Sequence, residues 1–399
     1  MRITRLELQN IGVFEHEIFD FDREKPADKA EIHIFTGVNG SGKSTILYAL
    51  ASPFNADFVK KRFRFKLKDS SCIRILYDYN EKEQTYNQYY YSNSKKPILY
   101  KFGVFGYSGF RSLSSVSLTA IKELTINSRK SLKFQDPVNS RMLLQWIANT
   151  KAKIAFASQD GNQDIAEKYR DSIERIENAV SQIVGYDVIF TFQYEPLSVG
   201  IRINGEELEF DVLPDGLKSV ISWIADLLMR MDRLKWKDNI PVLERNFILF
   251  LDEIEIHLHP SWQRKILPVV QKLFKNAQIF IATHSPFVVA SVSDAWIYKL
   301  APVDGKMKLT EVVKSKAGIS YPAVLDEIFD IDEYFDIQTE ADFKQFYQFK
   351  DELLSDNNSH LEEFSDLSRR LSQKGIEVQD IIGRELRQLE RITGKEFAL

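Results

Sequence analysis

A segment near the amino terminus has the residue types and spacing of a phosphate-binding loop. Residues 37–44 read Gly-Val-Asn-Gly-Ser-Gly-Lys-Ser and fit the pattern G-x-x-x-x-G-K-S/T. Glycines let backbone N–H groups face phosphate oxygens, the lysine reaches the β and γ phosphates, and the serine can bind Mg²⁺. An apolar strand pattern precedes the loop and a helical pattern follows it, a context that a chance glycine turn lacks. The residues predicted to bind nucleotide are Gly37, Asn39, Gly40, Ser41, Gly42, Lys43, Ser44 and Thr45.

Two carboxylates follow a second apolar segment, residues 248–251. Asp252 and Glu253 are expected at the carboxyl end of a buried strand, the edge at which open α/β sheets bind their ligands. There Asp252 would hold Mg²⁺ and Glu253 would polarise an attacking water. A strand end that merely meets solvent is the alternative, but a phosphate loop in the same chain favours the catalytic interpretation.

Two further segments could contact a nucleotide. His284 follows the next apolar strand and could touch a γ-phosphate, although a lone histidine is more often a core residue. Residues 213–219 read Leu-Pro-Asp-Gly-Leu-Lys-Ser and precede a predicted helix, whose amino terminus with Gly216 could bind an anion. Pro-Asp-Gly is also an ordinary turn, so the second segment alone is a weak indication.

The elements predicted around these residues belong to an α/β protein. Strands are expected in residues 1–35, 62–110 and 187–212, and helices in residues 46–60, 117–186 and 216–234. Two uniformly apolar strands, residues 247–251 and 278–282, enclose a helix at residues 260–274. This pattern predicts a parallel βαβ unit that is covered on both faces. From residue 318 onward the pattern is helical and polar.

Composition and charge exclude several classes of protein. The chain has 399 residues, of which 44% are hydrophobic and 28% charged, as in globular proteins. We expect no membrane-spanning helix and no signal peptide, and therefore a cytoplasmic protein. Cys72 is the only cysteine and the six histidines are scattered, which excludes an intramolecular disulfide and a multi-cysteine zinc site.

Together, these motifs resemble those of the ABC-type ATPase heads of the SMC, RecF and OLD group. Two blocks make the chain most similar to the ATPases of prokaryotic anti-phage systems, namely the ATPase subunit of Septu and related retron systems. They are residues 252–263, Asp-Glu-Ile-Glu-Ile-His-Leu-His-Pro-Ser-Trp-Gln, and residues 278–286, Gln-Ile-Phe-Ile-Ala-Thr-His-Ser-Pro. The resemblance covers residues 1–315 well and residues 316–399 more loosely.

The resemblance implies an ABC-type P-loop ATPase head, with a mixed-sheet lobe, a parallel-sheet core with helices and no long coiled coil. It implies ATP and Mg²⁺ as cofactors, Glu253 and His284 as catalytic residues, and Ser44 and Asp252 as metal ligands. It also implies a homodimer or higher homo-oligomer in which each nucleotide lies between one phosphate loop and the partner's signature. The signature residues acting in trans would be Asp215, Gly216, Lys218 and Ser219, and the turn crossing the interface would contain His257, Leu258 and His259.

The signature departs from the family's pattern. Pro214 stands where the family usually has serine, and Leu217 where it has glutamine or glutamate. Proline offers neither a hydroxyl nor an N–H to a γ-phosphate, so slow turnover is expected, and Lys218 or Ser219 could make the contact instead. Residues 105–111 are the candidate for the family's glutamine loop, and a glycine-kinked strand end is the alternative.

Two domains are expected, an ATPase head at residues 1–316 and an acidic helical extension at residues 317–399. Within the head we expect an antiparallel strand lobe at about 1–115, a helical lobe at about 116–235 and the core at about 236–316. Residues 321–399 contain 9 Lys+Arg against 19 Asp+Glu. This acidic extension would dock a nuclease or toxin effector encoded nearby, or would complete the core.

Nucleic acid is the other partner to consider. Arg64, Lys66 and Lys68 would share one face of a strand and could follow a phosphate backbone, although such residues also protect edge strands. The leading hypothesis is a dimerising ATPase that regulates an associated nuclease or toxin in anti-phage defence and is not itself a nuclease. A RecF-like DNA-repair clamp is the alternative, and a transporter subunit is the weakest hypothesis.

Overall fold

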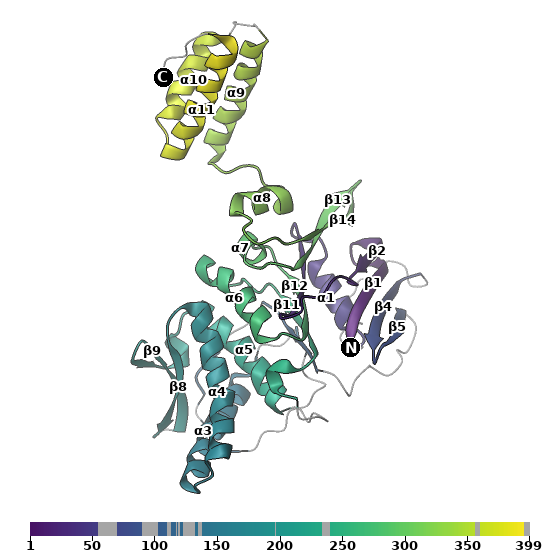
Figure 1. Cartoon of the computed structure of the whole chain (residues 1–399), viewed down its shortest axis with the longest axis vertical. Coiled ribbons are helices and arrows are strands. Elements are labelled where there is room, and N and C mark those ends of the chain that lie inside the picture. The colour runs from purple at the N-terminus through teal and green to yellow at the C-terminus, as the bar shows by residue number, and fades with distance from the viewer. Residues whose placement is uncertain are drawn as a thin grey trace. The chain divides into compact units, whose positions relative to one another are not determined.

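The chain packs as two compact units, Met1–Val324 and Leu325–Leu399 (Figure 1). The computed structural model describes residues 1–54, 70–89, 103–109, 113–116, 118, 120–122, 132–134, 138–195, 197–233, 240–355 and 360–394. Arg64, Lys66 and Lys68, which the sequence suggests as a nucleic-acid contact, lie outside these residues. The predicted domain boundary at residues 316 and 317 stays a prediction.

A seven-stranded sheet forms the centre of the first unit. Its strand order is β14-β13-β3-β12-β11-β6-β7, and every neighbouring pair is parallel except β13 and β14. The strands are β3 (Glu31–Gly37), β6 (Gly103–Tyr107), β7 (Leu132–Lys133), β11 (Phe247–Asp252), β12 (Ala277–Ala282), β13 (Trp296–Val303) and β14 (Lys306–Lys314). Strands β3 and β6 both belong to this sheet, although their residues fall within the antiparallel lobe predicted at about 1–115.

The predicted βαβ unit is confirmed. Strands β11 and β12 pair in parallel, with Asp252 opposite Ala282, and α6 (Pro260–Leu273) connects them. Every residue of both strands is buried, which explains why their sequences are apolar without alternation. His259 caps the helix because its ring accepts a hydrogen bond from the backbone N–H of Ser261.

An antiparallel sheet packs near the phosphate loop. Its order is β2-β1-β4-β5, formed by β1 (Arg2–Ile11), β2 (Phe14–Asp20), β4 (Cys72–Tyr79) and β5 (Lys82–Tyr89). Its buried side chains share one hydrophobic core with α1 (Lys43–Ala51) and with residues of β11, β12 and β13. Within that core the rings of Phe14, Phe19 and Phe35 meet edge to face, an arrangement that aromatic pairs prefer.

Helices α3 (Ser140–Gln159), α4 (Gln163–Val184) and α5 (Asp215–Arg233) form the next part of the unit, with β8 (Val188–Tyr194), β9 (Leu197–Ile203) and β10 (Glu206–Leu208) beside α3 and α4 (Figure 1). The prediction that residues 117–186 are mostly helical does not hold for the described residues between 117 and 139. These residues are irregular except β7, whose pairing with β6 overrides the local helical pattern.

The second unit is helical, as predicted. Helices α9 (Ile337–Leu354), α10 (Leu361–Ser372) and α11 (Ile376–Thr393) lie side by side around an apolar core (Figure 1). Helix α8 (Tyr321–Phe329) precedes them and spans the boundary between the two units. None of the described helices is long and apolar enough to cross a membrane.

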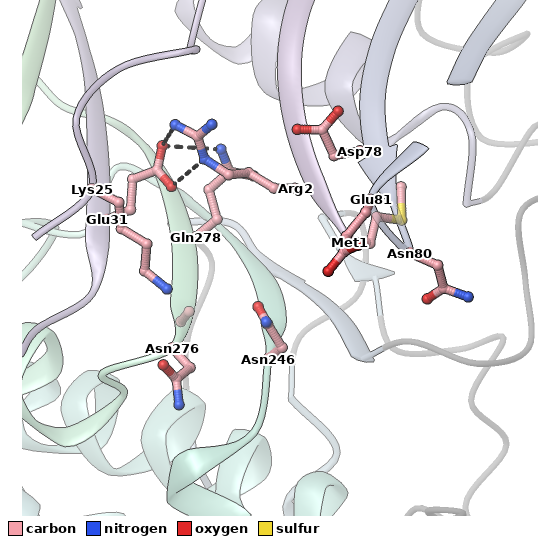
Figure 2. Close-up of a pocket in the computed structure, with 11 residues that line it drawn as sticks. Met1, Arg2, Lys25, Glu31, Asp78, Asn80, Glu81, Asn246, Asn276 and Gln278 are labelled. Atoms are coloured by element: carbon pink, nitrogen blue, oxygen red, sulfur yellow. Dashed lines mark hydrogen bonds and ion pairs between the residues drawn. The ribbon is translucent and has the colours of Figure 1, made fainter. Parts of the chain in front are cut away.

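A buried ion-pair network joins the two sheets at the amino-terminal end of β3. The Arg2 guanidinium donates to both carboxylate oxygens of Glu31, at 2.8 and 2.9 Å, and His33 lies 2.8 Å from the same carboxylate. Gln278 bonds both the N–H and the carbonyl of Ile3. A pocket of about 400 Å³ opens beside this network, and Figure 2 shows the Arg2 and Glu31 side chains facing each other in its wall.

We predict that Glu31 makes the free energy of unfolding depend on pH in the acid range. Burial raises the pKa of Glu31, but His33 and Arg2 outweigh it and lower the pKa from 4.5 to about 2. A lowered carboxyl pKa stabilises the fold above pH 4.5, and this contribution, about 3 kcal/mol, is lost as pH falls toward 2. In Glu31→Gln, urea unfolding should therefore show lower stability at pH 7 and a smaller loss on acidification.

Asp22→Asn is the control, because Asp22 pairs with the same guanidinium but is largely exposed. Its free energy of unfolding at pH 7 should stay within about 0.5 kcal/mol of wild type. Equal acid dependence in wild type and Glu31→Gln would contradict the prediction.

Candidate nucleotide-binding site

The carboxyl ends of four parallel strands bring the predicted motifs to one edge of the sheet. The phosphate loop follows β3, the acidic pair ends β11, His284 follows β12, and the Ser108-Gly109 segment follows β6. Because parallel strands point the same way, motifs far apart in sequence meet at this edge. The pocket in Figure 2 lies at the opposite edge, where β12 begins and β3 starts.

The phosphate loop has a backbone conformation that depends on glycine. Gly37, Gly40 and Gly42 have φ angles of 147°, 78° and 94°. A Cβ at Gly37 would lie 2.3 Å from the carbonyl oxygen of Leu300, and one at Gly42 would lie 2.6 Å from the Phe14 ring. Two of these glycines are therefore required by close approach as well as by φ.

Lys43 is buried at the start of α1 and bonds its own loop. Its Nζ donates to the carbonyl oxygens of Gly37 and Val38, each at 3.0 Å, and to the hydroxyl of Ser41 at 3.2 Å. Burial lowers the pKa of Lys43 to about 8, although the carboxylates of the acidic segment raise it. The ammonium group is thus held at the phosphate loop and still carries its charge at neutral pH.

Ser44 and Asp252 are in direct contact. The Ser44 hydroxyl donates to Asp252 Oδ1 at 3.1 Å, and the Tyr48 hydroxyl donates to Oδ2 at 3.3 Å. One buried carboxylate beside one hydroxyl fits Mg²⁺, which binds proteins through one or two such ligands and completes its shell with phosphates and water. Among the described residues, no group of three or more His, Cys, Asp or Glu could hold a metal by itself.

Glu253 has a strained backbone beside this pair. Its φ is 49°, and its N–H donates to the carbonyl of Ala282 on the neighbouring strand. A Cβ at Gly109 would lie 2.9 Å from Glu253 Oε2 and 2.4 Å from Ile256 Cδ1. The segment proposed for the glutamine loop thus contacts Glu253, and Gly109 leaves the space that the carboxylate occupies.

His284 faces the same edge from β12. Its backbone N–H donates to Glu255 Oε1 at 2.7 Å. Burial and the charge of Lys43 lower the pKa of His284, against the opposing charge of Glu253. The imidazole is therefore mainly neutral at neutral pH, and can make a hydrogen bond without adding a positive charge.

The signature segment forms the amino terminus of α5, as predicted. Asp215 is exposed, whereas Gly216 is buried. A Cβ at Gly216 would lie 2.5 Å from the carbonyl oxygen of His257 and 3.2 Å from the Trp262 ring. The signature and the predicted crossing turn therefore touch within one chain, with His257 and His259 exposed and Leu258 buried.

Two predicted signature residues, Lys218 and Ser219, have side chains that are largely or fully buried within the chain. Lys218 donates to the carbonyl of Asp211 at 2.8 Å and lies 3.9 Å from Asp215. Ser219 is fully buried, so its hydroxyl has no access to a partner's nucleotide in this conformation. The helical geometry turns position 219 into the core, a consequence that the motif alone does not reveal.

Sequence reasoning gave no individual role to four residues at this edge. Tyr48 bonds the Asp252 carboxylate, Gly109 accommodates Glu253, and Glu255 and Gln263 bond the segment around His284. The spacing of Tyr48, four residues after Ser44 on a predicted helix, is the one signal that could have indicated a shared face.

We predict that Lys43→Ala prevents nucleotide binding. The variant loses the buried ammonium group that is held at the phosphate loop, and ATP affinity should fall by about a hundredfold or more. Equilibrium titration with a fluorescent ATP analogue measures the change. Lys29→Ala is the control, since Lys29 pairs with Asp294 and lies outside the site. Unchanged affinity in Lys43→Ala would contradict the assignment of the loop.

Comparison with known proteins places the chain in a family. The chain matches a family described as "AAA domain, putative AbiEii toxin, Type IV TA system" over residues 32–290, and a second model, "AAA domain", over residues 1–61. It is similar to the Retron Ec83 probable ATPase of Escherichia coli, at 23% identity over 75% of this chain and 72% of that protein. It is also similar to the Septu protein PtuA of Bacillus thuringiensis, at 25% identity over 66% of this chain and 68% of that protein.

Among solved structures, the chain is similar to the SMC head bound to the C-winged helix domain of ScpA, at 14% identity and a TM-score of 0.48, covering 83% of this chain and 100% of that one. The first family model spans more than half of the chain and includes the phosphate loop, the acidic pair and His284. The chain therefore belongs to this AAA-domain family of ATPases.

Proposed function

We propose that the chain binds ATP with Mg²⁺, dimerises head to head around the nucleotide, and regulates a nuclease or toxin partner in anti-phage defence. The observation that carries the ATPase assignment is the contact of Ser44 with Asp252, with Glu253 beside it. This contact joins the phosphate loop to the acidic pair in one site, as hydrolysis of a phosphoanhydride requires.

The residues have distinct roles in this proposal. Lys43 and backbone N–H groups of the loop bind the phosphates. Ser44 and Asp252 would hold Mg²⁺, which when bound neutralises phosphate charge. Glu253 accepts the proton of the attacking water, because its carboxylate lies at the strand end next to the metal-binding residue. His284, neutral and on the adjacent strand, hydrogen-bonds the γ-phosphate.

Exposed residues at the same edge support the dimer. Val38 in the phosphate loop is 61% exposed, and the Asp215 side chain at the signature is 76% exposed. His257 and His259 of the crossing turn are also exposed. In the dimer these groups would meet the partner chain. Because Ser219 is buried and Pro214 lacks an N–H, the trans contact would be made by the amino terminus of α5.

An effector partner is proposed from the relatives and from charge. The named relatives belong to retron and Septu systems. The acidic helical extension, which we place from residue 317 onward, carries 19 acidic against 9 basic residues and is suited to a basic protein surface. The DNA-clamp alternative rests on Arg64, Lys66 and Lys68, outside the described residues.

We predict that Glu253→Gln traps the ATP-bound dimer. The amide cannot take a proton from water, so binding should persist while turnover falls by about a hundredfold or more. The tagged variant, expressed with its neighbouring genes and purified in ATP and Mg²⁺, would be examined by native mass spectrometry. A dimer with nucleotide and a second polypeptide bearing nuclease or toxin motifs is expected.

Lys43→Ala, prepared in the same way, is the control that should remain without nucleotide. Normal hydrolysis by Glu253→Gln would remove Glu253 from the catalytic role. A dimer that carries DNA and no protein partner would favour the repair-type clamp instead.

We predict that Gly109→Ala slows hydrolysis without weakening ATP binding. The added methyl group would collide with the Glu253 carboxylate and with Ile256, and must displace one of them. A misplaced base should lower kcat by about tenfold while KM changes little. Gly375→Ala is the control, because a Cβ there meets nothing within 4 Å and its φ of -61° is one that alanine adopts readily. Unchanged kcat in Gly109→Ala would show that the carboxylate needs no such space.

A further inference from the structure

Hydrogen bonds of the Gln263 and Glu255 side chains tie the switch loop, residues 283–286, to the crossing turn of residues 257–259 and to the residues just before it. The Ser285 hydroxyl donates to Gln263 Oε1 at 2.5 Å, and Gln263 Nε2 donates to the Leu258 carbonyl at 2.8 Å. Glu255 Oε1 accepts the N–H of His284 at 2.7 Å. His284, which is proposed to contact the γ-phosphate, is thus fixed by Glu255 at its own N–H and by Gln263 at the next residue, Ser285.

The orientation of the Gln263 amide is fixed by its partners. The Leu258 carbonyl can only accept, so the NH₂ group must face it, and the amide oxygen is left for Ser285. Ser285 in turn accepts the N–H of Val288 at 3.2 Å and caps α7 (Pro286–Val289). Every donor in this chain of bonds meets an acceptor, so the geometry has a single consistent assignment.

The crossing turn is fixed on its other side by the signature. His257 has a φ of 64°, and its carbonyl oxygen occupies the space where Gly216 would carry a Cβ. A shift of the switch loop would therefore move Gln263, which bonds the crossing turn, and the crossing turn in turn contacts the start of α5 at Gly216. Glu255 belongs to the same turn, since its carbonyl accepts the N–H of Leu258.

We propose that Gln263 and Glu255 are positioning residues for hydrolysis, which set the place of His284 relative to the crossing turn. Neither side chain contacts the reacting atoms in this assignment. Their effect is on the geometry of the switch loop, so they act on turnover and not on ATP affinity. The inference rests on the proposed ATPase function but does not require the effector partner.

Gln263→Glu tests this inference with little change of shape. The carboxylate would place an oxygen against the Leu258 carbonyl, where only a donor is tolerated. We expect kcat to fall by about tenfold while KM and the affinity for a non-hydrolysable ATP analogue stay within about twofold. In Glu255→Gln the amide oxygen can still accept from His284, so its kcat should remain closer to wild type than that of Glu255→Ala.

Gln271→Glu is the matched control. Gln271 lies on the same helix and donates to the carbonyls of Ala30 and Ser293, away from the nucleotide site. It should lower the melting temperature without lowering kcat. The inference is overturned if Gln263→Glu and Gln271→Glu lower kcat in proportion to the stability that each loses. It is also overturned if Gln263→Glu keeps wild-type kcat.

A double-mutant cycle with Ser285→Ala separates positioning from folding. If Gln263 acts through Ser285, the double variant should be about as slow as Gln263→Glu alone, whereas multiplied effects would overturn the inference. Should Gln263→Glu fail to fold, Ser285→Ala by itself must still reduce kcat at unchanged affinity. A wild-type chain that binds no nucleotide would instead overturn the proposed function.

Discussion

The parallel pairing of β3, β12 and β11 is the constraint on which the site depends. The register sets Phe35 beside Ala282, and Ala282 beside Asp252, so the phosphate loop, His284 and the acidic pair emerge from one edge. Uniformly apolar strands can take this place because helices and a second sheet cover them. A slip of one residue would turn Asp252 to the other face and remove it from Ser44.

Charge at this edge is arranged so that each buried group has a partner. Lys43 is held by two carbonyls and a hydroxyl, and Asp252 by Ser44 and Tyr48. These bonds are made by neutral groups, which a phosphate and a cation can replace without leaving a buried charge uncompensated. The phosphate loop and the acidic segment are therefore held together by the chain's own hydrogen bonds.

The sequence predicts the site better than its surroundings. The phosphate loop, Asp252-Glu253 and His284 are predictable because each follows an apolar strand, and parallel strands have only one shared carboxyl edge. The β13–β14 hairpin was not predicted, although Asp304-Gly305 between alternating residues is a recognisable turn with positive φ at both positions. The contacts of Gly109 and Gln263 could not be predicted, since their partners lie on other elements and only the fold brings them together.

Backbone strain at the carboxyl edge of the sheet lies opposite an amino-terminal edge with many side-chain bonds. Glu253, directly after β11, has positive φ although it is not glycine. Such conformations persist only where the surrounding structure over-determines them. At the amino-terminal end, Glu31 is tied to Arg2 and His33, and Gln278 ties β12 to β1. These bonds hold the starts of β3 and β12, so the register of the two strands that lead to the phosphate loop and to His284 is fixed from the opposite edge of the sheet.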